Sequence, residues 1–264
     1  MEQKQSWALV TGGSSGIGYE YACQLALRSY PVFIVSNQEP ECIQAANHIN
    51  RQYGVAARYL VTDLSLSNAA EEVYNFCRQN NMEIEVLVNN AGMFFWSLLH
   101  EASPEKILTI TQLHVTTPTM LCRLFGNEMR KKQKGYILNV ASIAAWMSFP
   151  TLATYANSKM YIKNFTLSLH YELKDYNVKV CYIAPGAVDT SLYQLSPKMR
   201  NILRKLHIML SPQEVARKGI NALMKGKKRV IPGCINYLFI GLVKICPLGL
   251  INIAKRLIYK KNDL

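Results

Sequence analysis

Trp7-Ala-Leu-Val-Thr-Gly-Gly-Ser-Ser-Gly-Ile-Gly18 is the stretch that decides the fold of this 264-residue chain. The apolar residues 7–10 predict a buried strand, and helical spacing over 16–29 predicts a helix directly after it. Glycines between a strand and a helix allow a tight turn and let the backbone approach a pyrophosphate at the helix N-terminus. The stretch therefore favours a dinucleotide site that includes Gly12, Ser14, Ser15, Gly16, Ile17 and Gly18.

The rest of the chain repeats the alternation of strand and helix. Apolar runs predict further strands at 31–35, 55–61, 84–88, 135–140, 178–183 and 229–231. Helical patterns occupy 40–53, 67–78, 104–129, 153–175 and 212–224. Pro118 should kink the longest of these helices or start a new one. Alternation of continuously apolar strands with helices predicts an α/β fold: a single doubly wound Rossmann domain, with a parallel sheet of about seven strands and helices on both faces.

Composition limits the class of protein and divides the chain in two. Half of the residues are hydrophobic, which is enough for a large buried core. The polar start lacks a secretory signal and the seven scattered cysteines lack metal-type spacing, so we expect a cytoplasmic protein with reduced thiols and no metal site. Residues 1–197 carry 15 basic and 15 acidic side chains, whereas residues 198–264 carry 15 and 2. The net charge of +13 therefore lies in the last quarter, which suggests an anionic partner there.

Tyr155 and Lys159 are candidate catalytic residues. They lie four positions apart in a predicted helix, so the phenol and the ammonium share one face. Tyrosine ordinarily titrates near pH ~10, and a fixed cation beside it lowers its pKa. The phenol then suits proton transfer between an alcohol and a ketone. The spacing alone is more typical of a core tyrosine beside a surface lysine, so the assignment depends on its surroundings.

The segment Val35-Ser36-Asn37-Gln38 bears on the choice of dinucleotide. An NAD site usually has a carboxylate near this point to hold the ribose hydroxyls. Here no carboxylate would repel a 2′-phosphate and no arginine or lysine would attract one, but Ser36 and Asn37 can hydrogen-bond it. We therefore expect NADP(H) to be favoured over NAD(H), and a loop without selectivity is the alternative.

The motifs of residues 5–230 together resemble the short-chain dehydrogenase/reductase family. In order they are Thr11-Gly-x-x-x-Gly-x-Gly18, Asp63-Leu64, Asn89-Asn-Ala-Gly92, Ser142, Tyr155-x-x-x-Lys159 and Pro185-Gly186 followed by Thr190. The resemblance implies that Ser142 hydrogen-bonds the substrate oxygen, Tyr155 passes the proton and Lys159 binds the nicotinamide ribose. It also implies cofactor contacts, with Asn89 near the adenosine ribose, for Asp63, Leu64, Asn89, Ala91, Gly92, Pro185, Gly186, Val188 and Thr190.

One position departs from the family pattern. The family usually has an asparagine in the long helix, where it holds a water molecule that links the lysine to solvent, and this chain has His114 there. A histidine can also hold a water molecule and can itself titrate. A buried histidine bonded to a backbone carbonyl is the alternative, so the proton relay at His114 is the open part of the predicted mechanism.

The end of the chain is both apolar and basic. The expected substrate lid, about residues 187–211, is rich in leucine, isoleucine and methionine, which suggests a lipophilic substrate. A tail at 233–264 follows the catalytic domain at 1–232, and Lys244 and Pro247 make it marginal as a spanning helix. Beside the basic cluster at 225–229 it suits an anionic membrane surface, with a dimer-interface or lid helix as the alternative. These features resemble, more loosely, reductases of 3-ketosphinganine, long-chain 3-ketoacyl or steroid ketones.

We therefore predict an NAD(P)H-dependent oxidoreductase that interconverts a lipophilic ketone and a secondary alcohol, is associated with a membrane and, as the family implies, forms a homo-oligomer. Two alternatives within the same fold are a non-catalytic dinucleotide-binding regulator and a reductase of a small soluble carbonyl compound. Intact Ser142, Tyr155 and Lys159 argue against the regulator. Nucleic-acid binding through the basic tail is not expected, because no stacking platform or recognition motif accompanies it.

Overall fold

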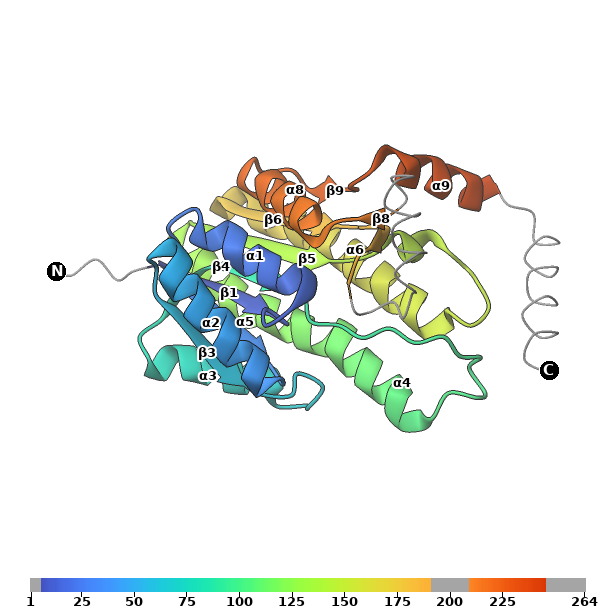
Figure 1. Ribbon diagram of the computed structural model, residues 1–264. Helices are drawn as coiled ribbons and strands as arrows, with labels where there is room; N and C mark the ends of the chain where they lie inside the picture. The colour runs from blue at the N-terminus through green and yellow to red at the C-terminus, as the bar shows by residue number, and fades with distance from the viewer. Residues whose placement is uncertain (1–5, 191–208, 246–264) are drawn as a thin grey trace.

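A seven-stranded parallel sheet forms the centre of the computed structural model, which describes residues 6–190 and 209–245 (Figure 1). Its order is β3-β2-β1-β4-β5-β6-β9. The strands are β1 (Ser6–Thr11), β2 (Val32–Ser36), β3 (Ala57–Val61), β4 (Glu83–Asn89), β5 (Gly135–Val140), β6 (Val178–Ile183) and β9 (Arg229–Val230). The order reverses between β1 and β4, so the carboxyl ends of these two strands border a crevice that suits a ligand. The predicted doubly wound fold is confirmed.

Helices connect the strands and cover both faces of the sheet (Figure 1). They are α1 (Gly16–Ala26), α2 (Glu39–Tyr53), α3 (Ala69–Gln79), α4 (Pro104–Thr111), α5 (Thr117–Lys132), α6 (Ala153–Leu173), α8 (Pro212–Met224) and α9 (Cys234–Ile245). The long helix predicted at 104–129 is divided by a π-helical turn at Gln112–Thr116. Pro118 lies in the first turn of α5, where its missing N–H costs little, and so starts a new helix as expected.

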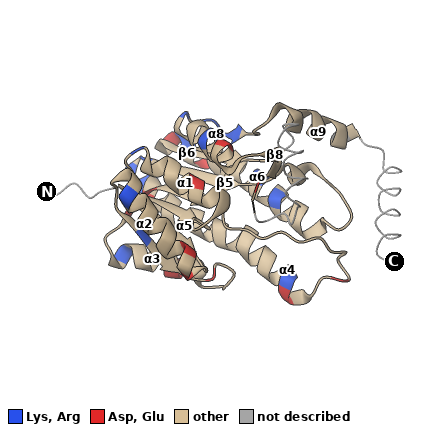
Figure 2. Cartoon of the chain, in the orientation of Figure 1, with Lys and Arg blue, Asp and Glu red and all other residues tan. Residues whose placement is uncertain are grey.

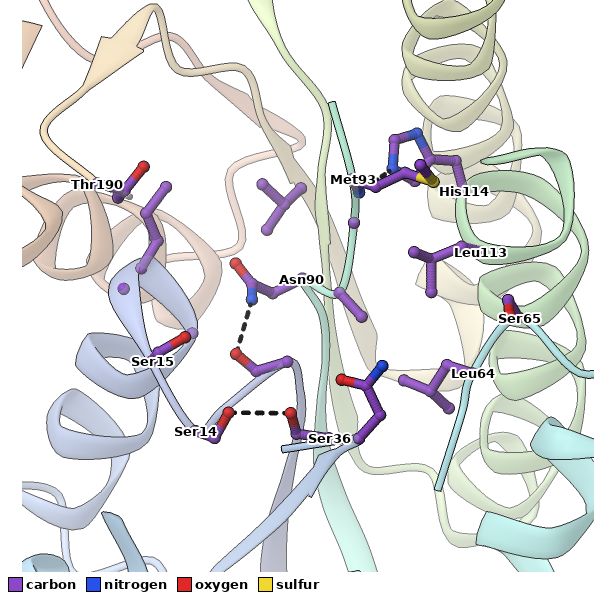
Figure 3. Close-up of a pocket in the computed structure, with 18 of the residues that line it drawn as sticks. Ser14, Ser15, Ser36, Leu64, Ser65, Asn90, Met93, Leu113, His114 and Thr190 are labelled. Atoms are coloured by element: carbon purple, nitrogen blue, oxygen red, sulfur yellow. Dashed lines mark hydrogen bonds between the residues drawn. The ribbon is translucent and has the colours of Figure 1, made fainter. Parts of the chain in front are cut away.

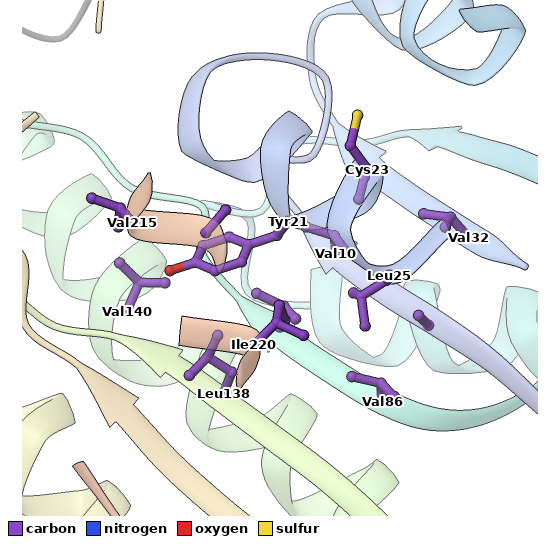
Figure 4. Packing of buried hydrophobic residues seen from close by; sticks show 14 of the residues in the cluster. Val10, Tyr21, Cys23, Leu25, Val32, Val86, Leu138, Val140, Val215 and Ile220 are labelled. Atoms are coloured by element: carbon purple, nitrogen blue, oxygen red, sulfur yellow. The ribbon is translucent and has the colours of Figure 1, made fainter. Parts of the chain in front are cut away.

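Alternate residues of each central strand face opposite hydrophobic layers. Ala8 and Val10 pack with α1, α2 and α8, whereas Trp7 and Leu9 pack on the side of α3 and α5. Figure 4 shows Tyr21 of α1 at the centre of the first layer, pointing toward residues of β5 and α8. A side chain at Gly219 of α8 would come within 3.0 Å of the Tyr21 ring, so this glycine allows the close packing of α1 on α8.

Two parts of the fold differ in cover from the central strands. The edge strand β3 pairs only with β2 and exposes Tyr59 and Val61. Its apolar run predicts a strand buried on both faces, and this expectation is not met at the edge of the sheet. A short ribbon of β7 (Ala187–Val188) and β8 (Met209–Leu210) brackets the expected lid, and residues 191–208 of that lid lie outside the described residues. Residues 246–264 of the predicted tail also lie outside them.

The described part of the tail is α9. Asn236 and Ile240 are buried, whereas Tyr237, Leu238 and Leu242 are each more than half exposed. None of the helices in the described ranges has the length and apolar character needed to cross a membrane.

Candidate active site

The glycine turn between β1 and α1 is shaped by close backbone packing. Gly12 and Gly16 have φ angles of 62° and 55°, in the left-handed region that favours glycine. A β-carbon on Gly12 would lie 3.0 Å from the Cα atom of Ala91, and one on Gly18 would collide with the Gly12 carbonyl oxygen. The turn therefore leaves a cradle of bare backbone at the N-terminus of α1, where an anion is stabilised.

Polar contacts tie the loop after β4 to this turn (Figure 3). Thr11 Oγ1 accepts hydrogen bonds from the backbone N–H groups of Asn90 and Ala91 at 3.0 and 3.1 Å. Asn90 Nδ2 donates to the Thr11 carbonyl at 3.1 Å, and Figure 3 shows this side chain directed toward the turn. The loop therefore forms a wall that faces the glycines across the crevice.

The structure places Asn89 outside the lining of the main cavity, whereas we expected it near the adenosine ribose. Asn89 Nδ2 donates to Asn139 Oδ1 at 2.8 Å, and the buried Asn89 side chain lies apart from the lining of the main cavity. Successive residues at a strand end point to opposite faces, so Asn90 lines the cavity in its place. The Asn-Asn pair could have indicated this difference, because only one of two adjacent asparagine side chains can face the ligand.

A cavity of about 550 Å³ lies at the carboxyl edge of the sheet. It brings together the other predicted residues: Gly12, Ser14, Ser15, Gly16, Ile17, Gly18, Ser36, Asn37, Asp63, Leu64, Ala91, Gly92, His114, Ser142, Tyr155, Lys159, Pro185, Gly186, Val188 and Thr190. Sequence reasoning missed Gln38, Thr62, Ser65, Asn90, Met93, Thr109, Leu113, Val140 and Ala141. Most of the missed residues are chain neighbours of predicted ones, and Thr109 and Leu113 face the cavity from α4 and the π-helical turn.

Hydroxyl and amide groups dominate one end of the cavity. Ser14 Oγ donates to Ser36 Oγ at 2.9 Å, which ties the glycine turn to the end of β2 (Figure 3). Asp63 Oδ1 accepts hydrogen bonds from the backbone and hydroxyl of Ser65 at 2.9 and 2.8 Å. The acidic and basic side chains in the lining are Asp63 and Lys159. The β2 end therefore offers neutral hydrogen-bonding groups to a ligand.

Ser142, Tyr155 and Lys159 are buried at the other end of the cavity. Tyr155 and Lys159 lie one turn apart in α6, and Lys159 Nζ is 5.8 Å from the centre of the Tyr155 ring. Lys159 Nζ donates to the Val140 carbonyl at 3.1 Å, which holds the ammonium at the end of β5. Burial lowers the pKa of Lys159 to about 8. Ser142 follows β5, and its Oγ accepts from the Ala144 N–H at 3.1 Å.

His114 lies in the π-helical turn and is 2% exposed. Its Nε2 atom is 3.0 Å from the Met93 backbone nitrogen, and Figure 3 shows the ring directed toward Met93. Its Nδ1 atom is 2.9 Å from Ser158 Oγ. Burial, and then the charge of Lys159, hold the pKa of His114 well below its ordinary value. His114 is therefore a neutral ring near pH 7, and its hydrogen-bond partners are Met93 and Ser158.

An aromatic wall, Phe94 with Trp96, lies beside Tyr155. The Phe94 ring meets the Tyr155 ring edge-on, with centroids 4.8 Å apart, and Trp96 packs on Phe94 at 5.2 Å. Ile110 and Leu152 extend the same apolar cluster. Sequence reasoning placed the apolar cover in the lid and missed this wall, although Met93-Phe-Phe-Trp96 follows directly after the Asn-Asn-Ala-Gly run.

The Pro185-Gly186 turn is backed by α9. A β-carbon on Gly186 would collide with the side chain of Asn236, whose Nδ2 donates to the Pro232 carbonyl at 2.5 Å. The Pro185 carbonyl accepts from the Ile143 N–H at 3.0 Å, which joins this turn to the Ser142 segment. The start of the tail therefore supports the floor of the cavity.

Comparison with known proteins gives the same family on sequence grounds. The family model for short chain dehydrogenase matches residues 6–201. The very-long-chain 3-oxoacyl-CoA reductase of Anas platyrhynchos is 30% identical over 250 residues, covering 90% of this chain and 74% of that protein. The 17-beta-hydroxysteroid dehydrogenase type 3 of Danio rerio is 30% identical over 193 residues, covering 70% of this chain and 62% of that protein. The match thus spans less than two thirds of the Danio rerio protein.

The fold also has solved counterparts. A short-chain dehydrogenase from Sphingobium yanoikuyae, solved in complex with NADPH, has a TM-score of 0.78 at 22% identity, over 92% of this chain and 96% of that one. This likeness is one of fold. With the family model covering most of the chain and the motif residues gathered around one cavity, the chain belongs to the short chain dehydrogenase family of oxidoreductases.

Proposed function

We propose that this protein is an NADP(H)-dependent reductase that converts a lipophilic ketone to a secondary alcohol, with Tyr155 as the acid. The observation that carries the proposal is one cavity that holds Ser142, Tyr155 and Lys159 at one end and the glycine turn at the other. A dinucleotide fits this arrangement, because its pyrophosphate would lie in the backbone cradle at Gly12–Gly18 and its nicotinamide beside Pro185, Gly186 and Thr190.

The proposed roles of the side chains are compatible with their placement in the cavity. When bound, the reduced dinucleotide supplies the hydride that the carbonyl carbon takes up. Ser142 Oγ–H donates a hydrogen bond to the carbonyl oxygen, which gains negative charge as the carbon is reduced. Tyr155 gives its phenolic proton to that oxygen, and the product is a neutral alcohol. The Lys159 ammonium, fixed by the Val140 carbonyl, stabilises the negative charge that remains on the phenolate.

An apolar surface beside the cavity, formed by Phe94 and Trp96, supports a lipophilic substrate. Phe94 packs on Tyr155, and Trp96 extends the wall toward solvent with 60% of its side chain exposed. A long apolar chain or a steroid skeleton buries such a surface, whereas a small polar ketone leaves it wet. The relatives named as a very-long-chain 3-oxoacyl-CoA reductase and a 17-beta-hydroxysteroid dehydrogenase support the same class of substrate.

The choice of NADP(H) rests on the end of β2. Ser14, Ser36 and Asn37 present hydroxyl and amide groups there, and the acidic residue of the lining, Asp63, follows β3. A 2′-phosphate can accept hydrogen bonds from these groups without facing a carboxylate at the β2 end. The ribose hydroxyls of NAD would lack the carboxylate that an NAD site usually has at this strand end.

We further propose that α9 rests on an anionic membrane surface. Tyr237, Leu238, Leu242 and Ile245 expose an apolar face. The segment between α8 and α9 carries four exposed basic side chains, Lys225, Lys227, Lys228 and Arg229, and Figure 2 shows this basic segment next to α9. Apolar side chains beside lysine and arginine suit the boundary between lipid tails and anionic head groups.

The test is a substrate series with the purified full chain and either NADPH or NADH. A long-chain 3-oxoacyl-CoA, a 17-ketosteroid and a short soluble ketone are compared by the rate of coenzyme oxidation. We expect the lipophilic ketones and NADPH to be preferred, and Tyr155→Phe to bind coenzyme but not to turn over. Turnover by Tyr155→Phe would refute the acid role, and preference for the short ketone would refute the substrate class.

Cosedimentation of the full chain with neutral and anionic vesicles tests the membrane contact of α9. Equal binding to the two kinds of vesicle would refute this contact.

A further inference from the structure

The hydrogen atoms around His114 can be assigned from its partners. The Met93 backbone N–H can only donate, so the His114 Nε2 atom must present its lone pair to it across 3.0 Å. A neutral imidazole then carries its hydrogen on Nδ1, which donates to Ser158 Oγ across 2.9 Å. Ser158 in turn donates its hydroxyl hydrogen to the Tyr155 carbonyl at 2.8 Å. Each donor in this chain meets one acceptor, so the three bonds agree on a single tautomer.

This chain of bonds connects the loop after β4 with α6, and the proposed chemistry depends on the relative position of these two elements. Met93 belongs to the loop that carries Gly92 in the cavity lining and Phe94 in the aromatic wall. Ser158 and Tyr155 belong to α6. The His114 ring also meets the Tyr155 ring edge-on, with centroids 5.8 Å apart. The histidine therefore spans the space between the β4 loop and the catalytic helix.

The surroundings of the ring oppose a charge on it. The titratable groups that face it are Lys159 and Tyr155, both from α6, while Gly92 and Met93 present backbone from the β4 loop. An imidazolium would direct an Nε2 hydrogen at the Met93 N–H and would add a second cation beside Lys159. A side chain at position 92 would also reach the ring, because a β-carbon there would lie 2.8 Å from Nε2.

We propose that His114 is a positioning residue: a neutral ring, protonated on Nδ1, that braces the β4 loop against α6 and so sets Tyr155 relative to Gly92 in the cavity lining and to the aromatic wall. It does not carry the proton. The proposal rests on the reductase function, and one readout of its test does not require turnover. In the family pattern an asparagine at this position holds a water molecule that links the lysine to solvent, whereas His114 would hold the loop and the helix in place.

Two amide substitutions cut the two bonds separately. In His114→Gln the amide oxygen can take the place of Nε2 and keep the Met93 bond, while the Ser158 bond is lost. In His114→Asn the amide nitrogen can take the place of Nδ1 and keep the Ser158 bond, while the Met93 bond is lost. Ser158→Ala removes the partner itself. His170→Gln is the matched control, because His170 also lies in α6 but bonds to the Val180 carbonyl away from the cavity.

For a brace, each of the three variants should lower kcat roughly 10-fold to 100-fold through misplacement of Tyr155. The pH profile of kcat should keep its wild-type shape, coenzyme affinity should be unchanged, and the double variant His114→Gln, Ser158→Ala should be no slower than His114→Gln. His170→Gln should behave as wild type. A changed pH profile in His114→Gln, or unchanged kcat in all three variants, would overturn the proposal.

Nitrogen-15 NMR of the His114 ring tests the tautomer without any substrate. We expect one protonated and one bare ring nitrogen in wild type, with Nδ1 protonated, and no change from about pH 5 to about pH 8. The signals are assigned by their loss in His114→Gln. A ring protonated on Nε2, or one that titrates in this range, would overturn the proposal even if the reductase activity stands. Absence of turnover in wild type with the expected spectrum would instead contradict the proposed function alone.

Discussion

Lys159→Met should make the coenzyme-free protein more stable near pH 7, although it removes a residue proposed to be catalytic. Lys159 is buried at 7% exposure, and its pKa is lowered by burial from 10.5 to about 8. The folded state thus disfavours the charged ammonium by about 3 kcal/mol relative to the unfolded chain at pH 7. Methionine has a similar length and no charge, so it avoids this cost.

The substitution also removes one favourable contact. The hydrogen bond from Lys159 Nζ to the Val140 carbonyl is lost, which costs about 1 kcal/mol. The net gain in unfolding free energy at pH 7 should therefore be about 2 kcal/mol.

The gain should depend on pH in a defined direction. The folded-state pKa of this base is below the unfolded value, so between about pH 8 and pH 10.5 the unfolded chain binds more protons than the folded one. Wild-type stability should rise with pH across that window as the buried ammonium deprotonates. At about pH 9.5 the cost in wild type falls to about 1 kcal/mol, and the advantage of Lys159→Met should vanish.

Urea denaturation of both coenzyme-free proteins at the two pH values measures the effect. Lys179→Met is the control, because Lys179 is a half-buried lysine whose ammonium also bonds a carbonyl, that of Met224, away from the cavity. The reasoning fails if Lys159→Met is less stable than wild type at pH 7. It also fails if the gain is the same at both pH values, since a packing effect would not follow the titration of the lysine.

Three further substitutions test other parts of the site. Asn37→Asp places a carboxylate at the end of β2 and should weaken NADPH binding about 10-fold or more while leaving NADH binding equal or stronger, as measured by titration of coenzyme fluorescence. Gly186→Ala should lower thermal stability because its methyl group meets Asn236, and the added change Asn236→Ala should restore much of the loss. Phe94→Ala should reduce kcat/KM for a long-chain ketone about 10-fold and for a short ketone much less, since it removes apolar contact at Tyr155.

The sequence predicts the sheet and the catalytic pair because both depend on local patterns. The strand and helix periods, the glycine turn and the Tyr155–Lys159 spacing each lie within a short stretch of chain. The division of the long helix follows from Pro118 for the same reason. The exposure of β3 cannot be predicted from a local pattern, because strand order, and not the residues of the strand, decides which strand lies at the edge.

The finer geometry of the site depends on pairs that are distant in sequence. The choice between Asn89 and Asn90 depends on which side of β4 meets the glycine turn, 79 residues earlier in the chain. The contact between Asn236 and Gly186 and the bond between His114 and Ser158 likewise join separate elements. The membrane contact of α9, the homo-oligomer and the coenzyme preference stay predictions, since each concerns a partner that meets the chain from outside.

The loop after β4 explains why a histidine can occupy position 114 only as a neutral ring. Gly92, Met93 and Phe94 are consecutive residues of this loop. Gly92 lies beside Lys159 and His114. Met93 donates its backbone N–H to the His114 ring, and Phe94 packs on Tyr155. A shift of this loop therefore moves Gly92 in the cavity lining and the aromatic wall together. A charged ring would repel Lys159 in a buried apolar setting, where such repulsion is weakly screened, and would break the bond to Met93. An uncharged ring keeps the bond to Met93 and so keeps the loop in place. The positive charge at this end of the described cavity lining is then that of Lys159.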